Sequence, residues 1–294
     1  MAAQLDQLRQ VVRARPLHAG LLAGGLVAVG VVVTWQLTET PEDAAAANGT
    51  ATSVPSPERI GLPPDLSPRP TADPLPAFSE LEAGPERKQA FIEYLTPVVR
   101  AINEEVAKRR AAVLALENKI AVGDALDAEE AEWLDRMILR YRVEPGDDAE
   151  QVADLKRRVD GIPPSLAVAQ AALESNWGSS RFAREGNNLY GKWCFTAGCG
   201  IVPARRAEGA THEVEAYDDA ADATRAYMHH LNSHPIYETL RDRRAAAREA
   251  DERPQGSDLA AGLVLYSAKG EEYVSMIRGV INTNELETLS VAGN

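Results

Sequence analysis

The sequence is poor in cysteine and in basic side chains. Its 294 residues include two cysteines, 31 lysines and arginines, and 44 aspartates and glutamates, which gives a formal net charge of −13. The shortage of positive charge argues against nucleic acid as a partner, because proteins bind phosphates through a basic surface. It does not argue against a neutral polymer such as a glycan, since net charge chiefly affects solubility and steering.

The two cysteines, Cys194 and Cys199, are too few for a cysteine-rich zinc site. They enclose a short segment that contains Gly198, a residue type that helps a tight loop to close. In an oxidising compartment the pair predicts a small-loop disulfide, whereas in the cytosol it would be two reduced thiols. The N-terminal segment decides between these alternatives.

Charged residues are absent from residues 17–37, LHAGLLAGGLVAVGVVVTWQL, in which His18 is the only ionisable group. A helix of about 20 apolar residues can span a bilayer. Three arginines precede this segment and three acidic residues follow it, so residues 1–16 are expected to be cytoplasmic. A retained signal anchor is favoured over a signal peptide cleaved near Ala44–Ala47, and both over a buried core helix. Either of the first two places the protein beyond the inner membrane: anchored in the periplasm or, if the segment is cleaved, soluble or secreted.

Two regions of different composition follow. Residues 38–85 are rich in proline and have no sustained hydrophobic period, which predicts an extended linker. Residues 86–160 have apolar residues at three- and four-residue spacing. They predict one long helix, kinked at Pro97, and two shorter helices capped by Asp127 and Asp148. This region is interpreted as the helical N-terminal part of the domain that follows.

A glutamate ends the next apolar helix. The helix is predicted to begin at Pro163 or Pro164, and Glu174 lies at its C-terminal end, shortly before Gly178. A carboxylate in that position is unfavourable with the helix dipole, and burial would also raise its pKa. A carboxylic acid that stays protonated near neutral pH is suited to be the general acid of a glycosidase. From helix position alone, an exposed or otherwise satisfied glutamate remains the favoured interpretation.

The segment EGNNLYGKWC that follows offers groups suited to sugar binding. Asn187 and Asn188 can hydrogen-bond hydroxyl and acetamide groups. Tyr190 and Trp193 have flat rings on which a sugar can stack. A turn for each asparagine and core packing for each aromatic ring are equally good interpretations.

The stretch ALESNWGSSRFAREGNNLYG resembles the signature of the glucosaminidase family, glycoside hydrolase family 73. The continuation to Arg241 resembles more narrowly the Bax-type bacterial members of that family, and the resemblance covers about residues 162–284. It implies a mainly α (α+β) fold over residues 161–286, with a lysozyme-like helical domain and a small β-hairpin lobe beside the cleft. The residues agree, because 201–206 and 211–217 are typical of a hairpin around a turn.

The resemblance implies an enzyme that hydrolyses the β-1,4 bond from N-acetylglucosamine to N-acetylmuramic acid, with Glu174 as the general acid. The second group would be an acidic residue of the β-lobe. Glu213 is favoured over Glu208, which can be a solvated turn residue, and Glu215 shares the strand face of Glu213. If a carboxylate activates water, the reaction inverts the anomeric centre; otherwise the substrate's acetamide can act as the nucleophile.

A tyrosine also lines the cleft of related proteins. The segment LYSAKGEEY resembles the family's Gly-Tyr-Ala-Thr segment and places Tyr266 there, although Leu265 and Ser267 depart from that pattern. Tyr273 is then assigned to the core. The resemblance implies no metal and no cofactor, and the histidines are interpreted as structural or surface residues.

The expected partners are the glycan strands of peptidoglycan and, through residues 17–37, the inner membrane; no protein partner is indicated. We predict that Cys194 and Cys199 form a disulfide that braces the loop leading into the hairpin. Two other functions remain: a peptidoglycan-binding protein without activity, and a lytic transglycosylase, which would leave 1,6-anhydromuramic ends.

Overall fold

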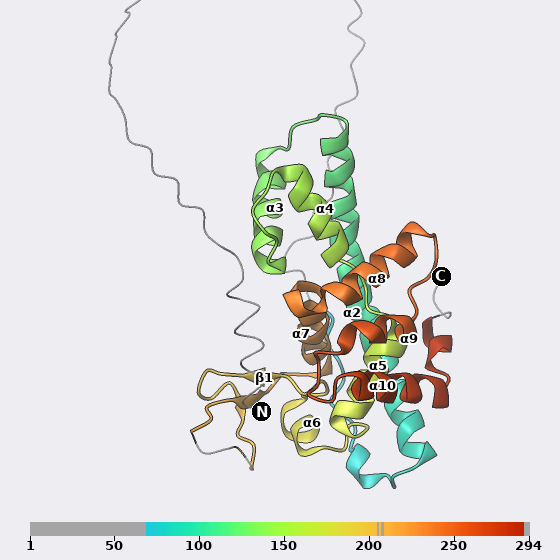
Figure 1. Ribbon diagram of the computed structural model, residues 1–294. Coiled ribbons are helices and arrows are strands. Elements are labelled where there is room, and N and C mark those ends of the chain that lie inside the picture. The colour runs from blue at the N-terminus through green and yellow to red at the C-terminus, as the bar shows by residue number, and fades with distance from the viewer. Residues whose placement is uncertain (1–68, 205, 207–208, 291–294) are drawn as a thin grey trace, which may run out of the picture. The chain divides into compact units, whose positions relative to one another are not determined.

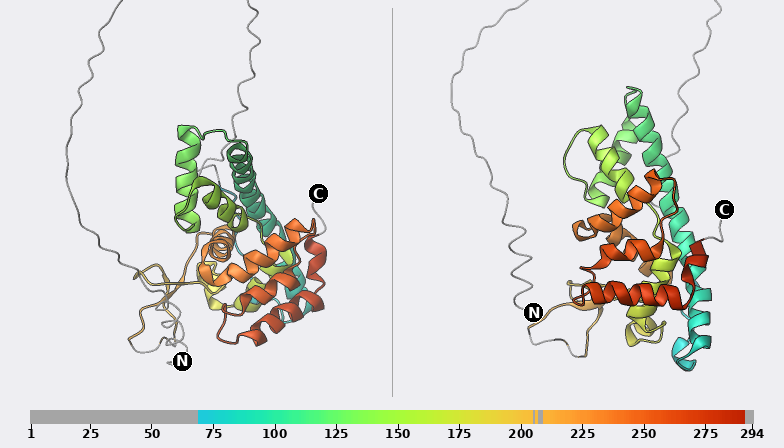
Figure 2. Two further views of the ribbon diagram at one scale, coloured as in Figure 1. Left: turned by 45° about the horizontal axis from the view of Figure 1, so that its top comes forward. Right: turned by 45° about the vertical axis from the view of Figure 1, so that its right-hand side comes forward.

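The computed structural model describes residues 69–204, 206 and 209–290, which belong to one compact unit. Its helices surround a buried central helix, and a small sheet lies to one side (Figures 1 and 2). The predicted mainly α fold with a small β-lobe is confirmed. The predicted membrane segment 17–37, most of the linker and Glu208 lie outside the described residues. Within the described part of the chain, no helix is both long and apolar enough to cross a membrane.

Helix α2, Pro85–Ala121, connects two hydrophobic cores. It is the long helix that the sequence predicts, and it includes Pro97. Its first half buries Phe91, Leu95 and Ile102 in the larger core, beside the short 3-10 helix η1, Phe78–Glu80. Its second half buries Val113 and other residues against α3, Ala128–Tyr141, and α4, Asp148–Arg158. Residues 86–160 therefore belong to the same compact unit as the rest of the described chain.

The two shorter helices begin with capping boxes. Asp127 caps α3 as predicted, with Glu130 closing the box. Helix α4 is capped by Asp147 rather than by the predicted Asp148, because the side chain of Asp147 accepts the backbone N–H of Glu150. Both helices bury an apolar face that includes Trp133 and Leu155.

Helix α5, Pro164–Ser175, lies at the centre of the larger core, where eight consecutive residues from Ser165 to Ala172 are buried. It packs against α2, α9 (Gly256–Leu259), α10 (Glu271–Thr283) and the 3-10 helix η4 (Leu286–Ser290). The other elements of this core are α7 (Ala220–Ser233), α8 (Glu238–Glu249) and the 3-10 helices η2 (Pro235–Tyr237) and η3 (Ala260–Leu263). Helix α9 is thus short and continues directly into η3.

The sheet has three short antiparallel strands in the order β1-β3-β2, in which β2 and β3 form the predicted hairpin and β1 adds a third strand. They are β1 (Trp193–Cys194), β2 (Gly200–Ile201) and β3 (Glu213–Glu215). Val214 is opposite Trp193 on one side and Ile201 on the other. Helix α6, Arg181–Gly186, packs beside β2, because Gly186 lets Ile201 and Ala216 approach its backbone.

Candidate active site

Glu174 lies in the last turn of α5, the position that the sequence predicted. The next residues leave the helix through Asn176, in the left-handed conformation, and no basic side chain lies in this turn. Burial disfavours the charged form of the carboxyl and raises the pKa of Glu174 above its ordinary value, and this effect exceeds the opposing one of a hydrogen bond from Tyr273. The site therefore favours a glutamic acid that keeps its proton longer than an exposed one does.

A chain of buried hydrogen bonds holds one carboxyl oxygen in place. The hydroxyl of Tyr227 donates to Oε1 of Gln170 at 2.7 Å, and Nε2 of Gln170 donates to the hydroxyl of Tyr273 at 3.1 Å. The hydroxyl of Tyr273 in turn donates to Oε1 of Glu174 at 2.8 Å. In all three hydrogen bonds the donor lies on the side away from Glu174, because Gln170 accepts with its carbonyl oxygen and donates with its amide nitrogen.

The other carboxyl oxygen, Oε2, has no hydrogen-bond partner among the described residues. It lies beside Gly191, where an added Cβ would be 3.1 Å from Oε2. Gly191 also has φ of +67°, a conformation that favours glycine, so a side chain there would be strained and would crowd the carboxyl. Because Oε1 accepts from Tyr273, the acidic proton belongs on Oε2, the oxygen left free to donate it.

Tyr266 supports this arrangement from behind Tyr273. The two rings stack with centroids 5.4 Å apart and planes 7° apart. The hydroxyl of Tyr266 donates to the backbone carbonyl of Tyr190 at 2.7 Å, which fastens the segment before α10 to the segment before Gly191. The sequence assigned Tyr273 to the core and Tyr266 to the cleft. In the structure Tyr273 is indeed buried, yet it is Tyr273 that contacts Glu174.

Three of the four residues predicted to bind sugar from the EGNNLYGKWC segment make structural contacts. Asn187 ends α6 in the left-handed conformation, and its amide donates to the carbonyls of Tyr217 and Asp218. Asn188 is buried and donates to the carbonyls of Lys192 and Glu215. These bonds tie the segment to the strands in the described conformation, and sugar binding by the two asparagines stays a prediction.

Tyr190 also makes structural contacts in the described conformation. It is fully buried and stacks on Tyr227 with centroids 4.0 Å apart, and its hydroxyl pairs with that of Thr224 at 3.2 Å. A ring enclosed in this way has no face for a sugar. Tyr190 contributes indirectly to the position of Glu174, because its ring packs against Tyr227, the first residue of the hydrogen-bond chain that ends at Glu174.

Trp193 is the aromatic residue of this segment that is accessible. Its side chain is 57% exposed and stacks on His212 of the neighbouring segment, with centroids 4.1 Å and planes 14° apart. Phe195 is also exposed on the same lobe. Trp193 therefore remains a predicted sugar-stacking residue, whereas Glu208 lies outside the described residues.

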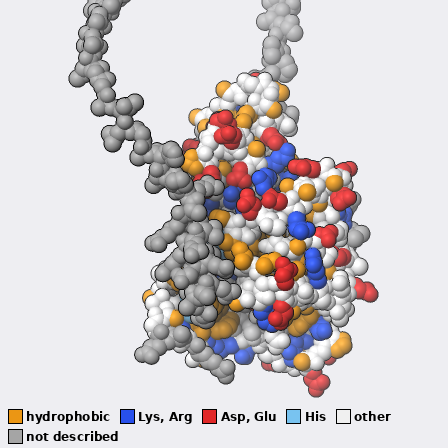
Figure 3. All heavy atoms as spheres, viewed as in Figure 1, with side chains coloured by type: hydrophobic (Ala, Val, Ile, Leu, Met, Phe, Trp, Pro, Cys, Tyr) orange, Lys and Arg blue, Asp and Glu red, His pale blue; other side chains and the backbone are white. Residues whose placement is uncertain are grey.

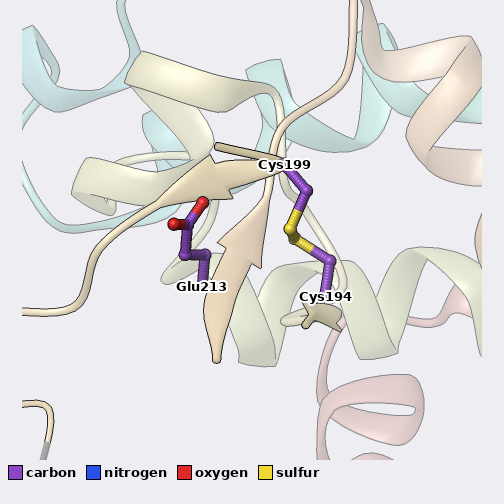
Figure 4. A group of neighbouring side chains, drawn as sticks. All are labelled: Cys194, Cys199 and Glu213. Atoms are coloured by element: carbon purple, nitrogen blue, oxygen red, sulfur yellow. A yellow bond between two sulfur atoms is a disulfide. The ribbon is translucent and has the colours of Figure 1, made fainter. Parts of the chain in front are cut away.

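The β-lobe contains the predicted disulfide between Cys194 and Cys199 (Figure 4). The carboxylate of Glu213 accepts the backbone N–H of Gly198 at 3.1 Å and of Gly200 at 2.9 Å. These two bonds lower the pKa of Glu213, so its stabilising charge is lost only as the pH falls through that lowered value. Glu213 braces the loop in this conformation, and its catalytic role stays a prediction.

Glu215, the other strand carboxylate, accepts from the hydroxyl of Tyr217 at 2.7 Å and lies 3.7 Å from Nζ of Lys192. Cys194, Cys199 and Glu213 also lie close enough together to resemble a metal site. Their sulfurs are joined in the disulfide, however, so they are not thiolate ligands.

With this geometry in view, the class of protein is clear: the chain belongs to the glucosaminidase family. The family model described as mannosyl-glycoprotein endo-beta-N-acetylglucosaminidase matches residues 149–286. Protein bax of Escherichia coli (strain K12) is 30% identical over 213 residues, which cover 72% of this chain and 74% of that protein. The match to the catalytic domain of the autolysin Auto from Listeria monocytogenes covers 72% of this chain and 93% of that domain, at 18% identity and with a TM-score of 0.39.

Tyr273→Phe should raise the pKa of Glu174 further, because it removes a hydroxyl that favours the charged carboxylate. If Glu174 is the general acid of a glycosidase, the decline of glycan hydrolysis toward high pH should move to higher pH, because a general acid works only while protonated. Tyr94→Phe is the matched control, because it deletes the hydroxyl of a tyrosine that donates to the carbonyl of Asp73 and makes no hydrogen bond to Glu174 or Gln170. The measurement is kcat/KM against pH; an unchanged profile for Tyr273→Phe, or an equal shift in both variants, contradicts the assignment.

Glu213→Ala should speed the hydrogen exchange of the Gly198 and Gly200 amides, because both donate to its carboxylate. Reduction of the disulfide should do the same by releasing the loop. Glu215→Ala, from the same strand, should leave both amides protected. Wild-type protection in Glu213→Ala, measured amide by amide by NMR, would show that the carboxylate does not brace the loop.

Proposed function

We propose that this protein is a peptidoglycan hydrolase, an endo-β-N-acetylglucosaminidase that cleaves the bond from N-acetylglucosamine to N-acetylmuramic acid. The observation that carries the proposal is the environment of Glu174: burial raises its pKa, one oxygen is held by Tyr273 and the other is unpartnered beside Gly191. A glycosidase general acid needs this combination of a retained proton and a defined direction of donation. Membership of the glucosaminidase family supports the class of reaction.

In the proposed reaction, Oε2 of Glu174 donates its proton to the glycosidic oxygen as the bond to the anomeric carbon breaks. The sugar left behind develops oxocarbenium character, and Glu174 becomes a carboxylate. The hydrogen bond from Tyr273 then stabilises the negative charge on Glu174, because hydrogen bonds to an ionised acceptor are stronger than neutral ones. Tyr273 thus helps the proton to leave while burial keeps it in place beforehand.

Two routes can complete the reaction. Water activated by a β-lobe carboxylate inverts the anomeric centre, and attack by the substrate's own acetamide needs no second carboxylate. The double hydrogen bond of Glu213 to Gly198 and Gly200 favours the acetamide route in the described conformation. Trp193, exposed and stacked on His212, offers the flat apolar surface that a sugar ring needs.

We also propose that the domain works in the periplasm and is held at the inner membrane by residues 17–37. The disulfide between Cys194 and Cys199 supports an oxidising compartment. Protease added to spheroplasts should digest the domain if it faces outward; full protection in intact spheroplasts, with digestion after lysis, would contradict this location.

Glu174→Gln should lower the release of muropeptides by about 10²- to 10⁴-fold, the usual contribution of a general acid. Glu249→Gln is the matched control, because Glu249 is an exposed glutamate at the C-terminal end of α8. Mass spectrometry of digested peptidoglycan identifies the reaction. Reducing N-acetylglucosamine ends are expected, whereas 1,6-anhydromuramic ends indicate a lytic transglycosylase and no release indicates a binding protein.

A further inference from the structure

A cavity lies at the amino end of α5, the end opposite Glu174. It has a volume of about 550 Å³ and is lined by α2, the segment between α4 and α5, and residues around the end of α8. From Pro164 to Glu174 the helix rises about 15 Å, at about 1.5 Å per residue. The cavity is therefore separate from the candidate active site, although both abut the same helix.

The cavity has an excess of positive charge. Its walls include four guanidinium groups and two carboxylates, from Arg100, Arg110, Arg248, Arg253, Glu104 and Asp160. The whole chain has a net charge of −13. On the face drawn in Figure 3, acidic and basic side chains are intermixed. The cavity therefore differs in the sign of its charge from the chain as a whole, because arginines outnumber carboxylates in its walls.

One of the two carboxylates is already shared. Asp160 is buried and lies 3.1 Å from Nη2 of Arg248, 3.6 Å from Nη1 of Arg110 and 3.7 Å from Nε of Arg244. The pKa of Arg244 falls to about 10, chiefly through burial and in part through repulsion by Arg110 and Arg248. A single carboxylate thus faces three cations, of which Arg110 and Arg248 line the cavity.

The structure itself holds these arginines in place. Arg110 donates to the carbonyls of Lys156 and Val159, and Arg100 donates to the carbonyl of Leu289 at 2.9 Å. The cations are therefore ordered before any ligand arrives, which lowers the entropic cost of binding. Between them the walls are apolar, with Pro163, Pro164 and Pro254 among the lining residues.

Ordered guanidinium groups recognise carboxylates through paired hydrogen bonds, and the apolar walls suit an organic body rather than a small inorganic ion. The volume is in the range of small-molecule sites. We propose that this cavity binds a peptide that carries several carboxylates, the class to which the stem peptides of peptidoglycan belong. The choice of a stem peptide rests on the proposed function; the preference for carboxylates rests on the arginines alone.

The test is calorimetric titration of the 294-residue chain with a sugar-free stem peptide of alanine, γ-linked glutamate and diaminopimelate. Arg100→Gln and Arg248→Gln should each weaken binding by about tenfold or more, which corresponds to about 1.4 kcal/mol. Arg243→Gln is the matched control, because Arg243 is exposed on the same helix as Arg248 but does not line the cavity. The same peptide with its carboxylates amidated should not bind.

Several results would overturn the proposal: no binding at millimolar peptide, equal weakening in Arg243→Gln, or equal binding of the amidated peptide. Binding of inorganic phosphate with the same dependence on Arg100, in the absence of peptide binding, would overturn the choice of ligand. Arg100→Gln keeps the test decisive if Arg248→Gln does not fold, since Arg100 does not contact Asp160. Peptide binding and glycan hydrolysis are measured separately, because the peptide has no glycosidic bond. If the wild-type protein binds the peptide but does not hydrolyse peptidoglycan, the result counts against the proposed function alone.

Discussion

The hydrogen bond from Tyr273 to Glu174 is the contact on which the candidate site depends. It requires α10 to lie against the last turn of α5, and Gln170, one turn earlier on α5, to orient the tyrosine hydroxyl. Gln170 is itself oriented by Tyr227 of α7. Three helices that are distant in sequence must therefore pack correctly before one carboxyl oxygen is held and the other is left free.

Burial and hydrogen bonding act on Glu174 in opposite directions. Desolvation favours the protonated form, and the Tyr273 hydroxyl favours the carboxylate, with burial the larger of the two. This opposition is useful for proton donation, because the group has to hold its proton before the reaction and stabilise the charge after it. The β-lobe is held together separately, by the disulfide and by Glu213, and it presents Trp193 without contributing to this balance.

The sequence was most informative where the determining interactions are local. Neighbouring residues determine where the helix that carries Glu174 ends and how the helices are capped. They also determine the disulfide, because its two cysteines are only five positions apart. It was least informative where contacts join distant segments. Tyr273 is 99 residues from Glu174, and its type alone does not distinguish a core tyrosine from one that orients an acid. Asn188 and Glu213 have groups that can bind sugar or activate water, but here they satisfy backbone groups of the loops beside them.

The central claim is that Glu174 is a carboxylic acid with a raised pKa. Its most direct test is a ¹³C NMR titration of glutamate-labelled protein, with the Glu174 carboxyl resonance assigned by its loss in Glu174→Gln. We expect a midpoint clearly above the ordinary glutamate value of about 4.3. A midpoint at or below that value would contradict the claim, because the carboxyl would then be ionised before any substrate arrived.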